Sequence, residues 1–425
     1  MKFENNIDFA KYLDNKDELK HFREKFYIPM INGKDSIYFT GNSLGLQPKT
    51  TQEHILNELE DWANYGVEGH FHAKNPWVSY HEMFSPLLSE IVGGLPEEIV
   101  AMNQLTVNLH LLMMSFYQPT KERYKIICEA KAFPSDQYAL ASQAQLHGLD
   151  PAKTIIEISP KKGEYNIRTE DILTAIKEHG KETAVVMFGG VNYYSGQLFD
   201  MQSITKAAHE AGAYCGFDLA HAAGNVSIKL HDWNVDFACW CSYKYLNSGP
   251  GGVAGAFIHQ KHISNKKLLR LAGWWGQDKA NRFKMEKDFD PIPTAEGWQL
   301  SNAPVLSMAA HKASLDIFHE AGMDNLIAKG KLLSSYLLFV LDEINSSVTE
   351  NIIEIITPRN EAERGCQVSM LMLKNGKNIF EALKKEGVIA DWREPNVIRI
   401  APVPLYNSFE DIYKFGEVIS KMISD

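Results

Sequence analysis

The residue with the clearest chemical potential in this sequence is Lys244, which stands between Tyr243 and Tyr245. An apolar run precedes this lysine, and the glycine cluster of residues 249–252 follows it. A lysine between two phenols at the end of a strand is placed to form a Schiff base, because burial and nearby charge can lower the pKa of its amine. A single lysine in a loop is more often exposed, so this interpretation depends on other residues.

A carboxylate in an earlier segment strengthens the interpretation. Asp218 ends another apolar run and is followed by His221. A carboxylate that faces a pyridine nitrogen keeps it protonated, and the ring then acts as an electron sink. Taken alone, an aspartate at a strand end is better explained as a helix N-cap. Together with Lys244, Asp218 favours a site for pyridoxal phosphate (PLP), and His221 either contacts the ring or is a buried core histidine.

Two helix starts are candidates for holding the rest of such a cofactor. Thr106 supplies a hydroxyl at the head of a predicted helix, where phosphate groups bind readily. Phe133 follows a strand and opens another helix, so that its ring could stack on the cofactor. The alternatives are a capping threonine and a core aromatic. The glycines of residues 249–255 match neither a Walker loop nor a dinucleotide fingerprint.

To form one site, these residues must be brought to the same edge of a sheet. Strand and helix patterns alternate along the middle of the chain, as such a sheet requires. Helices are predicted at 51–65, 135–147 and 204–211, and strands at 125–130, 154–158, 184–188, 214–217, 237–241 and 253–258. Such alternation predicts an α/β fold with a mainly parallel sheet and a ligand site at the strand ends.

The pattern changes in the last part of the chain. An apolar stripe over 307–344 predicts long helices with a break near Gly322, and the final part reads as strands at 368–373, 388–392 and 397–400 with helices at 379–386 and 409–423. We therefore expect three parts. Residues 1–50 form an N-terminal segment packed on a small α+β lobe, residues 51–305 a large cofactor-binding domain, and residues 306–425 a connecting helix and small C-terminal domain.

Composition excludes several classes of function. Lys and Arg number 43 against 53 Asp and Glu, and no dense basic patch indicates nucleic-acid binding. No apolar run approaches the ~20 residues of a membrane span, and the N-terminus lacks the core of a secretory signal. The five cysteines are odd in number, and the pair Cys239 and Cys241 has no second pair at zinc-ligand spacing. We expect a cytoplasmic protein with reduced thiols and no metal.

Several of these segments together resemble the kynureninase family, a group of fold-type I PLP enzymes within aminotransferase class V. The resemblance extends over nearly the whole chain. Its motifs are GNSLGLQP (41–48), LTVNLHLLM (105–113), FPSDQYA (133–139), GFDLAHAAGN (216–225), DFACWCSYKYLNSGPGG (236–252), GWWG (273–276), SNAP (301–304) and RIAPVPLYNSF (399–409). The combination in this order is specific. It implies the fold-type I architecture, with helices on both faces of the central sheet.

The resemblance also implies roles for residues of the cofactor site. Lys244 would form the Schiff base and move the substrate's proton, Asp218 would pair with the pyridine nitrogen, and Tyr243 would contact phosphate and donate a proton. The remaining cofactor-binding positions are Leu105, Thr106, Phe133, Asp136, His221, Trp274 and Asn302.

Other positions match the family's substrate contacts. Arg399 would bind the substrate carboxylate, which suits a guanidinium fork. Ser43, His70 and Asn302 would surround the substrate ring. The resemblance implies a homodimer in which Trp274 and Asn302 reach the site of the second subunit, although the adjacent Trp275 competes for the same assignment. Some relatives carry a serine at the position of Gly189, so any contact from Gly189 would be through its backbone.

The activity implied is hydrolysis of L-kynurenine to anthranilate and L-alanine, and of 3-hydroxy-L-kynurenine to 3-hydroxyanthranilate and L-alanine. This reaction serves tryptophan catabolism or NAD precursor synthesis. The polar set around the substrate ring favours the hydroxylated substrate at least as much as kynurenine. The alternatives are a cysteine desulfurase-like class V enzyme, which would need a cysteine in an exposed glycine-rich loop, and a silent PLP-binding protein, which would have lost site residues.

Overall fold

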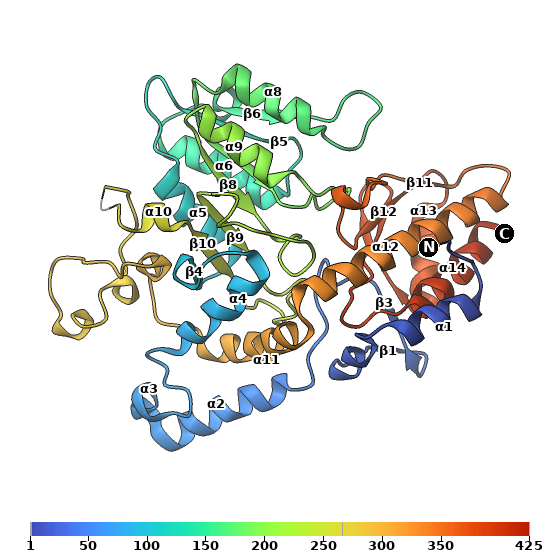
Figure 1. The fold of residues 1–425 in the computed structure, drawn as a ribbon, viewed down its shortest axis with the longest axis horizontal. Coiled ribbons are helices and arrows are strands. Elements are labelled where there is room, and N and C mark those ends of the chain that lie inside the picture. The colour runs from blue at the N-terminus through green and yellow to red at the C-terminus, as the bar shows by residue number, and fades with distance from the viewer. Residues whose placement is uncertain (1, 266, 425) are drawn as a thin grey trace.

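A large domain and a smaller lobe make up the chain, and two consecutive long helices connect them (Figure 1). The computed structural model describes residues 2–265 and 267–424. Both termini lie in the smaller lobe, so the chain leaves this lobe, builds the large domain and returns. No helix among the described residues is long and apolar enough to cross a membrane.

A seven-stranded sheet forms the centre of the large domain, and it confirms the predicted α/β fold. The strands run in the order β4-β10-β9-β8-β7-β5-β6, and only β10 pairs antiparallel with its neighbours. Their bounds are β4 (Ile99–Ala101), β5 (Lys125–Glu129), β6 (Ile155–Ile158), β7 (Thr183–Gly189), β8 (Tyr214–Asp218), β9 (Phe237–Trp240) and β10 (Gly255–Ile258). The short strand β4 carries no recognisable sequence signal and was not predicted.

Both faces of this sheet are buried, as the continuous apolar strands require. Along β7, Val185 and Met187 pack with the helices of one face, whereas Val186 and Phe188 pack with those of the other. The large domain contains α2 (Thr51–Tyr65), α3 (Gly69–His72), α4 (Phe84–Val92), α5 (Leu105–Phe116), α6 (Pro134–Leu146), α7 (Pro151–Thr154), α8 (Thr169–His179), α9 (Met201–Glu210) and α10 (Gln260–Ile263). Because successive residues of a strand point to opposite faces of the sheet, β7 packs against the helices of both faces.

The connecting helices α11 (Val305–Ala321) and α12 (Met323–Ser347) meet at Gly322, whose φ of 75° ends the first helix where the sequence predicts a break. The lobe beyond them has an antiparallel sheet in the order β11-β12-β15-β14, covered by helices. Its elements are β11 (Ile353–Ile355), β12 (Val368–Met372), α13 (Gly376–Lys385), β14 (Asp391–Arg393), β15 (Val397–Ile400) and α14 (Phe409–Ser424).

One element of the lobe differs from the sequence prediction. The single strand predicted over 388–392 is wrong, because the chain forms β13 (Val388–Ile389) and then enters β14 in another sheet. β13 pairs in parallel with β3 (Ile37–Tyr38) of the N-terminal segment. That segment also contains α1 (Ile7–Lys16), β1 (Met30–Ile31) and β2 (Lys34–Asp35). A pairing partner that distant in the sequence leaves no local signal.

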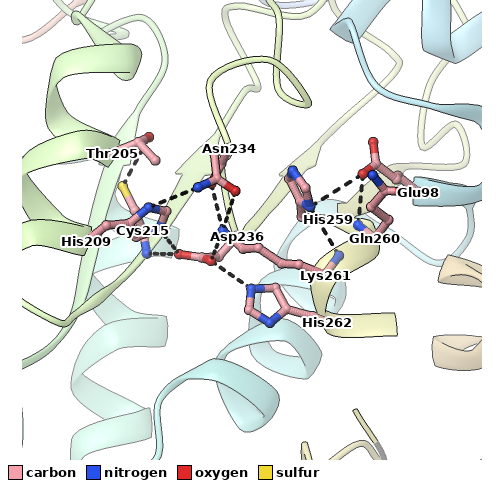
Figure 2. A network of polar contacts seen from close by, with 10 residues as sticks. All are labelled: Glu98, Thr205, His209, Cys215, Asn234, Asp236, His259, Gln260, Lys261 and His262. Carbon is pink, nitrogen blue, oxygen red and sulfur yellow. Dashed lines mark hydrogen bonds and ion pairs between the residues drawn. The ribbon is translucent and has the colours of Figure 1, made fainter. Parts of the chain in front are cut away.

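The sheet is anchored at the end opposite its ligand edge by the buried carboxylate of Asp236, directly before β9. His209 on α9 and His262 on α10 each lie 2.7 Å from its oxygens, and Lys261 lies 2.8 Å away (Figure 2). The N–H of Cys215 on β8 donates to the same carboxylate at 2.7 Å. Burial alone would raise the pKa of Asp236, but these hydrogen bonds hold it well below its usual value.

Replacement of Asp236 by asparagine should lower the free energy of unfolding by about 3 kcal/mol, because the surrounding cationic groups lose a buried anionic partner. The folded-state pKa is lowered, so the contribution is complete above the unfolded pKa of about 3.9 and is lost as the pH falls below it. Urea unfolding at neutral and acidic pH measures both effects. The exposed Asp232 provides the control, Asp232→Asn. A difference between wild type and D236N that persists unchanged in acid would contradict this account.

Candidate functional site

A cavity of about 190 Å³ lies at the carboxyl ends of β5, β7, β8 and β9, the edge at which parallel strands present ligand sites. Much of the predicted cofactor set lines it: Leu105, Thr106, Phe133, Asp136, Asp218, His221, Tyr243 and Lys244. Glu129, Ser135, Gly189, Val191, Tyr193 and Ala220 complete the lining. The topology therefore brings together side chains that are scattered over more than a hundred positions of sequence.

The amine of Lys244 faces into this cavity. Its Nζ lies 3.0 Å from Nε2 of His221 and 5.6 Å from the centre of the Phe133 ring. The turn that carries Lys244 is held from behind by Gly45, whose N–H donates to the carbonyl of Tyr243 at 2.8 Å. A Cβ at Gly45 would lie 2.4 Å from the carbonyl oxygen of Lys244, so only glycine permits this contact.

His221 is a neutral base in this structure. Burial lowers its pKa well below the usual value, and the charges of Lys244 and Arg399 lower it further. Its Nε2 faces Lys244, whereas its buried Nδ1 has no hydrogen-bond partner within the described residues. A buried polar atom without a partner on a cavity wall is costly unless a ligand or water satisfies it. This position on the cavity wall favours a role for His221 in the site over that of a buried core histidine.

A pair of carboxyl groups lies beside the lysine. Asp218 ends β8 and accepts from the N–H of Ala220 at 2.6 Å, and Asp136 in the first turn of α6 hydrogen-bonds with it. Burial raises the pKa of Asp136 well above its usual value, and the charge of Asp218 raises it further. Burial raises the pKa of Asp218 as well, but the N–H of Ala220 and the charge of Lys244 favour its carboxylate form, which is the form that pairs with a cationic ring nitrogen.

Tyr243 remains a phenol at neutral pH. Burial raises its pKa, and so does the neighbouring Cys241. A phenol in this state is a hydrogen-bond donor and a proton source.

The first turn of α5 provides a site for an anion. Leu105 and Thr106 begin the helix, and its N-cap residue, Gln104, makes no side-chain hydrogen bond to the helix. Gln104 instead donates to the carbonyl of Gly251 at 3.2 Å. The leading N–H groups are thus left for a ligand at the positive end of the helix dipole. A nucleophilic amine, a carboxylate, an aromatic ring and an anion-binding helix end fit a phosphorylated pyridine aldehyde such as PLP.

Arg399 lies behind this cavity rather than on its wall. It is fully buried on β15, where one terminal nitrogen donates to the carbonyl of Tyr193 at 2.7 Å and the other pairs with Asp391. Its Nε has no partner within the described residues. The ion pair between Arg399 and Asp391 is therefore buried rather than exposed at the surface.

The other predicted residues do not line the cavity of a single chain. Ser43 belongs to the segment packed behind the Lys244 turn. His70 lies on α3, near one end of α2 (Figure 1), and its ring contacts that of Trp77. Trp274 is half-exposed and donates to the carbonyl of Arg282, whereas Trp275 is buried. Asn302 is exposed ahead of α11. A second subunit would have to bring these residues to the site.

Glu129 and Tyr193 are among the wall residues that the sequence analysis missed. Glu129 is a charged residue at the end of an apolar strand, and that signal was present in the sequence but was not used. Tyr193, which presents its ring edge to Phe133 at 5.2 Å, stands in a loop without a motif.

Family models and curated relatives match this chain. A family model described as "Kynureninase C-terminal domain" matches residues 326–419, and one described as "DegT/DnrJ/EryC1/StrS aminotransferase family" matches residues 79–231. The chain is 57% identical to the kynureninase of Flavobacterium psychrophilum, over 100% of this chain and 99% of that protein. It is 55% identical to that of Christiangramia forsetii, with the same coverage.

A solved cysteine desulfurase from Thermococcus onnurineus NA1 has a similar fold, with a TM-score of 0.74 over 92% of this chain and 95% of that one. At 18% sequence identity, this similarity speaks for the fold alone.

Replacement of Lys244 by alanine should abolish covalent attachment of PLP. Borohydride reduction followed by mass spectrometry should show one added pyridoxyl phosphate group on the wild-type chain and none on K244A, because no other amine of the described residues lines the cavity. The exposed Lys229 offers a matched control, and Lys229→Ala should retain the group. Labelling of K244A at the wild-type level would contradict the assignment.

Proposed function

This chain belongs to the kynureninase family and is a PLP-dependent hydrolase of a carbon–carbon bond, and we propose that the cavity around Lys244 is its active site. Its reaction converts L-kynurenine to anthranilate and L-alanine, and 3-hydroxy-L-kynurenine to 3-hydroxyanthranilate and L-alanine. The single observation that carries the site assignment is the position of Lys244 in a cavity with Asp218 and the open end of α5.

PLP, when bound, supplies an electron sink that stabilises negative charge on the substrate's α-carbon. Asp218 is placed to hold the ring nitrogen protonated. The amine of Lys244 faces into the cavity and is placed to take the α-proton, and neutral His221, at 3.0 Å, can accept a hydrogen bond from it and orient it. The turn held by Gly45 fixes the position of this amine.

Cleavage of the Cβ–Cγ bond requires water at the γ-carbonyl and a proton for the departing carbon. Tyr243, a protonated phenol on the cavity wall next to Lys244 in the chain, is placed to donate that proton. Arg399 supports binding of the substrate's carboxylate, because a buried guanidinium with an unpartnered Nε favours an anion.

The cysteine desulfurase-like alternative is compatible with the fold, but it requires a reactive cysteine thiol. All five cysteines are buried, and burial raises the pKa of each thiol. A buried thiol with a raised pKa is a poor nucleophile. The same reduced, unpaired thiols support a cytoplasmic location, where disulfides are rare.

Anthranilate fluorescence should appear when the holoenzyme is given L-kynurenine, and K244A should produce none. Steady-state rates on both substrates test the substrate preference. Because Ser43, His70 and Asn302 are polar, we expect kcat/KM for 3-hydroxy-L-kynurenine to equal or exceed that for L-kynurenine. A strong preference for L-kynurenine would refute this preference, and the absence of both products would refute the function.

Exposed apolar side chains support a homodimer. Helix α2 was predicted to have one apolar face, yet Trp62 is 60% exposed on it, and Val67 just beyond it is 74% exposed. Phe71, Phe283 and Met285 are also exposed, the last two in the segment that projects from the large domain between β10 and α11 (Figure 1). Large exposed apolar groups gathered on a few neighbouring elements are typical of an interaction surface. The half-exposed Trp274 belongs to the same projecting segment.

The variant Trp62→Glu should convert the dimer to a monomer, because a buried charge at an interface is costly. Light scattering coupled to size-exclusion chromatography measures the mass, and activity should fall with it if Trp274 and Asn302 serve the partner's site. Leu373→Glu is the control, since Leu373 is also exposed but lies on the small lobe. A W62E protein that remains dimeric and active would contradict this interface.

A further inference from the structure

Glu129, at the end of β5, has no role in the mechanism described above, although it lies on the cavity wall and is only 4% exposed. One carboxylate oxygen accepts from the N–H of Gly189 at 3.0 Å, and the other accepts from Nδ2 of Asn192 at 2.7 Å. A Cβ at Gly189 would lie 2.7 Å from the first of these oxygens. Glycine at this position therefore lets the carboxylate lie directly against the end of β7.

Asn192 connects Glu129 to the turn that follows β7. Its Oδ1 accepts from the N–H groups of Tyr194, at 3.0 Å, and Ser195, at 2.9 Å. Its backbone closes the turn at both ends, with its N–H donating to the carbonyl of Gln197 and its own carbonyl accepting from Gly196. The side-chain amide of Asn192 thus uses its donor on Glu129 and its acceptor on the turn.

The same turn accepts hydrogen bonds from the small lobe. The carbonyl of Tyr193 accepts from Arg399 at 2.7 Å and from Nε2 of Gln367 at 3.1 Å. Both donors come from the small lobe, and Arg399 is the residue that we assign to the substrate's carboxylate. Glu129 is therefore linked to Arg399 by the hydrogen bond from Asn192, the covalent backbone between Asn192 and Tyr193, and the hydrogen bond from Arg399 to the carbonyl of Tyr193.

We propose that Glu129 is a positioning residue that sets the affinity for the substrate's carboxylate, by holding the turn of residues 192–197 and, through it, Arg399. This inference rests on the proposed function, because it concerns the arginine of that site. Glu129 contacts neither Lys244 nor Arg399 directly, so that its effect should fall on substrate binding rather than on the chemical step.

The carboxylate form of Glu129 is the one that can accept both hydrogen bonds. Burial raises its pKa to about 7, opposed by the hydrogen bonds from Asn192 and Gly189 and assisted by the charge of Asp218. Asp136 on α6 and the Cys128 thiol on β5 also interact with this carboxylate. Since protonation would remove one acceptor, the turn should loosen as the pH falls through this value.

The test compares Glu129→Gln with wild type across the neutral pH range. Glutamine can accept only one of the two hydrogen bonds, so KM for L-kynurenine should rise about tenfold with kcat little changed, the effect of losing one hydrogen bond to a charged group. Wild-type KM should rise as the pH falls through about 7, whereas the KM of E129Q should lack this dependence. Glu157→Gln, an exposed change on the neighbouring strand, should behave as wild type.

A second measurement does not depend on turnover. Amide hydrogen exchange without substrate should be faster in E129Q over residues 189–197 and unchanged over α5. Asn192→Ala should raise KM similarly, and the double variant should cost no more than either single change, since both break one chain of contacts.

Unchanged KM, a kcat-only defect, a wild-type pH dependence in E129Q, or unchanged exchange over residues 189–197 would each overturn the proposal. A wild-type enzyme that forms no anthranilate would instead remove the proposed function. The exchange comparison would then still decide whether Glu129 holds the turn.

Discussion

Three carboxyl groups share one buried cavity with a single amine, and they cannot all carry a charge. Glu129 ends β5, Asp136 follows it and Asp218 ends β8, and only β7 separates these two parallel strands, so the topology brings the three groups together. Burial raises the pKa values of all three groups, and the charges of neighbouring carboxylates raise those of Asp136 and Glu129 further. Proton placement within this set determines which groups are acids, which are acceptors and which are left to face a cationic ring.

The surroundings of the cavity follow from this constraint. Neutral His221 adds no positive charge beside Lys244, and the open first turn of α5 provides the compensating positive potential at the other end of the cavity. Arg399 contributes a further positive charge from the small lobe, where it is held by Asp391 and by the carbonyl of Tyr193. The large domain thus determines the cofactor environment, and the small lobe adds the group for the substrate's anion.

Local sequence patterns were sufficient to predict most strands of the central sheet and the long connecting helices. Apolar runs bounded by turn residues located β5, β7, β8 and β9, and the glycine break separated α11 from α12. Local patterns failed where pairing is distant. No local sequence pattern between residues 388 and 392 indicates that β13 pairs with β3 and that β14 pairs with β15. The apolar face of α2 was found correctly, but its exposure in the single chain was not, because periodicity does not tell which partner covers a face.

By itself, the sequence determined the chemistry of the site. Lys244, Asp218, Thr106 and Phe133 were identifiable because each is a chemically distinctive residue at the end of a regular element. Only the tertiary structure decided that Arg399 is buried in an ion pair, that burial raises the pKa of Asp136, and that a turn links Glu129 to Arg399. Residue type and local period can be read from the sequence. Burial, pKa shifts and hydrogen-bond partners instead depend on groups that only folding brings together.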